Sequence, residues 1–129
     1  MMKVTIIAPE GLKEKYLREA ADEYIKRLRG FCDLKIAEFS PFKLPEKPSA
    51  AQIAAALDRE AEQILKKIPE GSRTAALCIE GKMLSSEELA AEIRTADNSG
   101  TPFTFIIGSS HGLAEQVKKN ADIRLYFQK

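Results

Sequence analysis

Five short stretches of the chain are rich in apolar residues, and each has the length and composition of a β-strand. The run at 103–107 is continuous and contains β-branched and aromatic residues, as in a buried strand. The run at 32–39 instead alternates, with Leu34, Ile36 and then Phe39 as its apolar positions. We expect strands at residues 3–8, 32–39, 74–79, 103–107 and 123–127.

Between these strands, apolar residues recur at the spacing of an amphipathic helix. Ser49 is a predicted N-cap, because its hydroxyl can accept from a free N–H in the first helical turn. Ser85 and Glu88 have the spacing of a capping box, which predicts another helix start. Helices are therefore expected over residues 12–29, 50–68, 86–96 and 113–119.

The order of these elements predicts the fold class. Strands that alternate with helices favour a parallel, doubly wound α/β sheet with helices on both faces. Residues 40–49 contain three prolines and are expected to form a loop. The chain has 129 residues and no internal repeat or linker, which indicates a single domain over residues 1–129.

Composition narrows the possible functions. A net charge of +1 argues against strong non-specific binding to nucleic acid. Cys32 and Cys78 are far apart and lie in apolar runs, which suits buried thiols in a reducing cytosol. The chain has one histidine, and no apolar run is long enough for a signal peptide or a membrane span. We expect a soluble cytoplasmic protein that holds no metal.

The segment 103–113 has the order strand, glycine loop, helix. This order places backbone N–H groups at the carboxyl edge of a parallel sheet, where ligands bind in open α/β folds. The alternative is a structural turn that uses Gly108 and Gly112 for its geometry. His111 lies in this loop and is a candidate for acid–base work, or else a solvent-facing side chain. Lys82 could meet an anion in the loop at 80–82, or be simply solvated.

The first predicted helix carries basic residues that could face RNA phosphates. Acidic residues are interleaved with them, however, and an ordinary salt-bridged surface explains the same pattern. The residues thus support a small α/β domain with a ligand edge formed by the loops at 80–82 and 108–112, and they do not select a reaction.

Three segments together resemble one family. They are residues 12–16, Leu77–Ser86 with its Gly-Lys-Met-Leu-Ser-Ser sequence, and Phe105–Leu113 with its Ile-Gly-Ser-Ser-His-Gly-Leu sequence. In this order they resemble the bacterial large-subunit ribosomal RNA methyltransferase H family, of the SPOUT or α/β-knot class.

The resemblance implies a homodimer that transfers a methyl group from S-adenosylmethionine to N3 of a pseudouridine in ribosomal RNA. The family holds its cofactor among loops that follow three strands. Carried over by motif, Leu77 would line the adenine pocket and Gly108 would let the backbone approach the cofactor. Phe127, Gln128 and Lys129 would begin the third cofactor loop.

The sequence also departs from the family pattern. Ser109 follows Gly108 where the family usually has a second glycine, and His111 stands where Asn or Glu is common. Family members continue for about one more helix beyond the position of Lys129, and that helix threads the knot and packs in the dimer interface. We therefore expect an unknotted trace and a dimer with a different interface.

Two functions of different classes compete. The first is a working methyltransferase, in which His111 and Lys129 are the remaining candidates to assist proton loss from N3. The second is a non-catalytic relative that has lost the cofactor and binds RNA or a protein partner. A third possibility is that the sequence is part of a longer enzyme.

Overall fold

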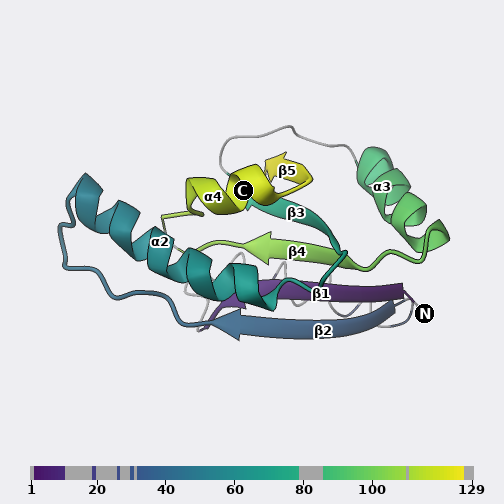
Figure 1. Cartoon of the computed structure of the whole chain (residues 1–129), viewed down its shortest axis with the longest axis horizontal. Helices are drawn as coiled ribbons and strands as arrows, with labels where there is room; N and C mark the ends of the chain where they lie inside the picture. The colour runs from purple at the N-terminus through teal and green to yellow at the C-terminus, as the bar shows by residue number, and fades with distance from the viewer. Residues whose placement is uncertain are drawn as a thin grey trace.

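A parallel sheet of five strands forms the centre of the computed structural model, which describes residues 2–10, 32–78, 86–109 and 111–126 and the single positions 19, 26 and 30. The strand order is β2-β1-β4-β3-β5 (Figure 1), and every pair of neighbours is parallel. The strands are β1 (Met2–Pro9), β2 (Cys32–Phe39), β3 (Arg73–Cys78), β4 (Phe103–Ile107) and β5 (Ile123–Tyr126). The predicted parallel α/β sheet is confirmed.

Helices cover both faces of this sheet, as predicted. They are α2 (Ala50–Lys67), α3 (Ser86–Asn98) and α4 (Glu115–Asn120). In Figure 1, α2 and α4 lie in front of the strands, and both contribute to a core cluster that includes Ile64, Val117, Ile7 and Ile106. On the other face, Ala96 of α3 packs in a second cluster with sheet residues. The central strands are therefore buried on both sides.

The predicted helix boundaries are close to those observed. Ser49 caps α2 in a capping box with Gln52: Ser49 Oγ accepts from Gln52 N at 3.1 Å, and Ser49 N donates to Gln52 Oε1 at 2.9 Å. The expected helix at 113–119 begins two residues later, because Leu113 and Ala114 are buried in the core in non-helical conformation. Ser85, of the second predicted capping box, lies outside the described residues.

Two further predictions fall largely outside the part of the chain that the structure describes. The predicted helix at 12–29 is described only at Glu19 and Lys26, which are both helical and exposed. The unknotted trace depends on the chain beyond Tyr126, and it stays a prediction.

Candidate functional site

The carboxyl ends of all five strands meet at one edge of the sheet, because the strands are parallel. After β1 the chain continues to β2, at one outer edge of the sheet, and after β4 it continues to β5, at the opposite outer edge. Since β1 and β4 are neighbours, this edge contains a topological switch point, the position at which open α/β sheets bind ligands. This is the same edge at which the glycine loop after β4 lies.

Leu77 and Gly108 come together at this edge. Leu77 is paired with Ile107 across β3 and β4, which places it beside the residue before Gly108. Leu77 and Ile107 are both half-buried, so apolar side chains line the sheet where the strands end. The other three predicted cofactor residues, Phe127, Gln128 and Lys129, lie outside the described residues, as does Lys82.

The loop from Gly108 to Gly112 folds back tightly on itself. Gly112 N donates to the carbonyl oxygen of Ser109 at 2.9 Å, and Gly112 has φ +88°, which favours glycine. A Cβ built on Gly108 would lie 2.6 Å from the carbonyl carbon of Gly112 and 3.0 Å from Cγ of Leu113. Gly108 is therefore required by the close approach of the backbone, and His111 is left exposed at the tip of the turn.

The side chain of Ser109 is bonded to helix α2. Its hydroxyl donates to Oε1 of Glu60 at 2.7 Å, and Oε2 of Glu60 accepts from the backbone N of Phe42 at 2.9 Å. Glu60 is 3% exposed, whereas Phe42 is 47% exposed, and the guanidinium of Arg59 lies 5.6 Å from the centroid of the Phe42 ring. One buried carboxylate thus joins α2 to the loops that follow β2 and β4.

Glu60 is not among the site residues predicted from the sequence. A signal was present, because Glu60 is four residues from both Ala56 and Ile64 and so falls on the buried side of the helix. A charged residue at such a position is rarely buried unless polar groups surround it. Its two partners come from distant segments, so only the tertiary structure shows them.

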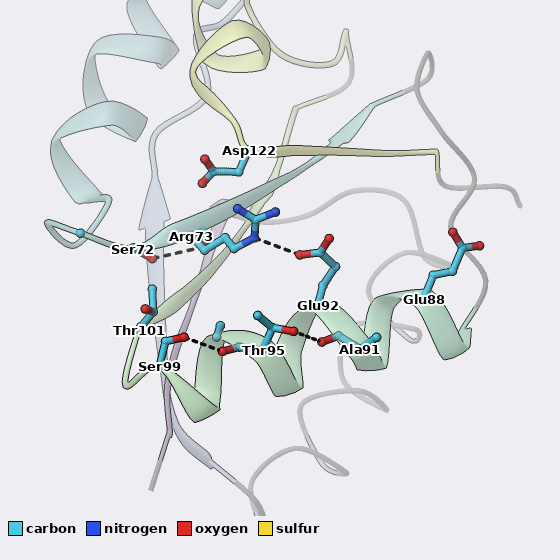
Figure 2. Close-up of a pocket in the computed structure, with 11 residues that line it drawn as sticks. Ser72, Arg73, Glu88, Ala91, Glu92, Thr95, Ser99, Thr101 and Asp122 are labelled. Atoms are coloured by element: carbon cyan, nitrogen blue, oxygen red, sulfur yellow. Dashed lines mark hydrogen bonds and ion pairs between the residues drawn. The ribbon is translucent and has the colours of Figure 1, made fainter.

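An open groove lies at the opposite end of the sheet. It has a volume of about 770 Å³ and runs between α3 and the amino ends of β3 and β5 (Figure 2). The guanidinium Nε of Arg73 crosses it to Oε2 of Glu92 at 3.0 Å. Leu77 and Gly108, at the carboxyl end, do not line this groove.

Polar groups around this groove are engaged in local structure. Thr95 and Ser99 donate their hydroxyls to helix carbonyls of α3, each at 2.9 Å. One carboxylate oxygen of Asp122 accepts from Thr74 N at 2.8 Å, which ties the start of β5 to β3. We therefore assign the groove to the packing of α3 rather than to the candidate ligand site.

Cys32 is buried, as predicted for it, whereas the side chain of Cys78 lies outside the described residues. Burial raises the pKa of the Cys32 thiol above its ordinary value of 9.0, and the neighbouring carboxylate of Asp33 raises it further. Within the part of the chain that the structure describes, no group of His, Cys, Asp and Glu side chains could hold a metal ion. None of the described helices is long and apolar enough to cross a membrane.

Comparison with known families agrees with this architecture. A family model described as "Predicted SPOUT methyltransferase" matches residues 2–129. The chain belongs to the SPOUT methyltransferase family. The resemblance seen in the sequence motifs is thereby confirmed, and the parallel five-stranded sheet is consistent with this family.

Similar proteins within this SPOUT family carry a more specific name. The chain is 46% identical to the ribosomal RNA large subunit methyltransferase H of Alkaliphilus oremlandii over 127 residues. The proteins of that name from Ligilactobacillus salivarius and Lactococcus lactis are 43% and 39% identical over the same length. In each case the match covers 98% of this chain and 80% of the relative.

Proposed function

We propose that this SPOUT protein is an S-adenosylmethionine-dependent methyltransferase that modifies a base of large-subunit ribosomal RNA. The observation that carries the proposal is the 46% identity, over nearly the whole chain, to a protein named ribosomal RNA large subunit methyltransferase H. The target implied by the resemblance is N3 of a pseudouridine. The alternative, a binding module without cofactor, has no specific observation in its favour.

The residues at the carboxyl edge fit the proposed cofactor. An adenosyl group needs an apolar slot and nearby backbone groups for its ring nitrogens. Leu77 and Ile107 are half-buried apolar residues at the ends of adjacent strands, and Gly108 follows with no side chain. In this proposal Leu77 lines the adenine and the backbone near Gly108 approaches the cofactor, while Phe127, Gln128 and Lys129 complete the site.

In methylation the cofactor and the protein have different roles. S-adenosylmethionine supplies the methyl group on its positively charged sulfur. The protein must hold the target base in line with that group and assist the loss of the N3 proton. His111 is the titratable side chain that the 108–112 loop itself carries, and its exposure leaves it accessible to a substrate.

Calorimetric titration of the purified chain with S-adenosylmethionine and S-adenosylhomocysteine tests the cofactor part of the proposal. We expect micromolar binding that is lost when Gly108 is replaced by leucine, because that side chain has no space beside Gly112. Absence of heat with both ligands would contradict cofactor binding and favour the binding-module hypothesis.

Transfer of a radiolabelled methyl group from S-adenosylmethionine to bacterial ribosomes tests the activity itself. Label on large-subunit RNA, mapped to N3 of a pseudouridine, is the expected result. Label on protein alone, or no transfer by a chain that binds the cofactor, would contradict the proposed substrate.

The homodimer is also part of the proposal and rests on the resemblance. Light scattering coupled to gel filtration measures it directly, with twice the mass of one chain as the expected result. A monomer that still methylates ribosomes would show that dimerisation is not needed for activity.

A further inference from the structure

Glu60 is a buried charged side chain that the proposed chemistry does not use. It is 3% exposed and lies on α2 beside Ala61, which is fully buried in the core. Burying a carboxylate is costly unless hydrogen-bond donors replace the water that it loses. Helix α2 could pack with an apolar residue at this position at lower cost, so the carboxylate needs an explanation beyond packing.

The two hydrogen bonds of Glu60 supply that explanation. Oε1 accepts from the Ser109 hydroxyl at 2.7 Å, and Oε2 accepts from the Phe42 backbone N at 2.9 Å. Both distances are within the usual range of well-formed hydrogen bonds, and both oxygens of the buried side chain therefore have a donor. Each carboxylate oxygen therefore fixes a different loop at the same edge of the sheet.

Ser109 directly follows Gly108, the residue at which an added Cβ would lie 2.6 Å from the carbonyl carbon of Gly112. The loop is thus restrained from two sides: Gly112 closes it from within, and Glu60 holds it from the side of α2. Ser109 stands where the resemblance leads one to expect glycine, and its side chain is directed to Glu60. The serine thereby adds a restraint that glycine could not provide.

We propose that Glu60 is a positioning residue, which holds the 108–112 loop through Ser109 and joins it to the loop after β2 through Phe42. The proposal rests on the function proposed above insofar as the held loop is the cofactor loop. Removing the restraint lowers the fraction of molecules whose loop is ready to bind, and the apparent cofactor affinity falls by the same factor.

Three variants remove the hydrogen bond between Ser109 and Glu60, and a fourth variant can preserve it. Ser109→Ala removes the donor, Glu60→Met removes the acceptor at similar length, and the double variant tests whether the two effects are non-additive, as expected for partners in one bond. Glu60→Gln is the conservative variant, because its amide can accept from Phe42 N and donate to the Ser109 hydroxyl.

Gln63→Met is the matched control. Gln63 lies one turn further along α2 and is bonded to the loop after β2, accepting from Ser40 N and donating to Ser40 O at 3.0 Å each. It shares with Glu60 the role of joining α2 to that loop, and its two bonds to Ser40 do not involve Ser109. A general loosening of α2 would affect this control as much as the test variants.

Amide hydrogen exchange without cofactor decides whether Glu60 holds the loop. We expect about tenfold faster exchange at the Gly112 amide in Ser109→Ala and Glu60→Met, and no change in Glu60→Gln or Gln63→Met. Unchanged exchange in the first two variants would overturn the proposal. This measurement reads the loop directly, so it decides even if the cofactor does not bind.

Calorimetry with S-adenosylmethionine, well below the unfolding temperature, decides whether the held loop serves the cofactor. We expect affinity to weaken about three- to tenfold in Ser109→Ala and Glu60→Met and to be retained in the other two. Faster exchange with unchanged affinity would overturn the link to the cofactor. No binding by the unmodified chain would contradict the proposed function, while the exchange result would still decide the positioning role.

Discussion

Gly108 and Gly112 are in such close contact that a Cβ on Gly108 would be 2.6 Å from the carbonyl carbon of Gly112. The contact closes the loop after β4 and lies one residue beyond Ile107, the strand partner of Leu77. Here the backbone contact excludes any side chain, so substitution at Gly108 must deform the loop.

Gly108→Ala is expected to destabilise the protein by about 1–3 kcal/mol, the usual cost of forcing additional atoms into a closely packed site. Urea unfolding measures this cost. Gly30→Ala is the matched control, because a Cβ there meets no atom within 4 Å and its φ is not in the left-handed region. Equal stability of the two variants would contradict the close contact at Gly108.

Asp122→Ala is expected to destabilise the protein by about 1–3 kcal/mol, because the buried N–H of Thr74 loses its acceptor. Asp122→Asn should cost less, since an amide oxygen can still accept from that N–H. Urea unfolding ranks the two variants, with Asp58→Ala on the exposed side of α2 as control. A loss no greater than that of the control would show that the bond does not stabilise the β3–β5 pair.

The raised pKa of the Cys32 thiol should make the stability of the protein depend on pH. Its pKa in the folded state is raised above 9.0 by burial and by Asp33, so the native protein retains a proton that the unfolded chain releases. Stability should therefore fall as the pH rises above about 9. The measurement is the difference in unfolding free energy between the unmodified chain and Cys32→Ala at pH 8 and 10. A difference that does not shrink at pH 10 would contradict the raised pKa.

Glu92→Gln tests whether the large groove at the amino ends of the strands takes part in cofactor binding. Glu92 and Arg73 are each partly exposed, and such ion pairs contribute at most about 1 kcal/mol. We expect a small loss of stability and an unchanged affinity for S-adenosylmethionine by calorimetry. A large loss of affinity at unchanged stability would place the cofactor in this groove instead of at Gly108.

The sequence alone determined the kind and order of the described elements. Apolar runs and helical stripes predicted the parallel sheet and the helices on both faces, because each element's periodicity reflects the face that it buries. The cap at Ser49 was equally local, since its partner Gln52 lies within one helical turn. Sequence motifs also led to the SPOUT family, whereas the approach of the Gly108 backbone to the cofactor, which the resemblance implies, stays a prediction.

Only the tertiary structure decided which distant residues meet. Glu60 bonds to Ser109, 49 positions away, and Asp122 bonds to Thr74, 48 positions away. Nothing in local spacing encodes such pairs, because they depend on how helices and strands pack across the sheet. The same is true of the large groove, which lies at the end of the sheet away from Leu77 and Gly108. A periodic pattern reports which face of an element is buried, whereas packing decides which partner that face meets.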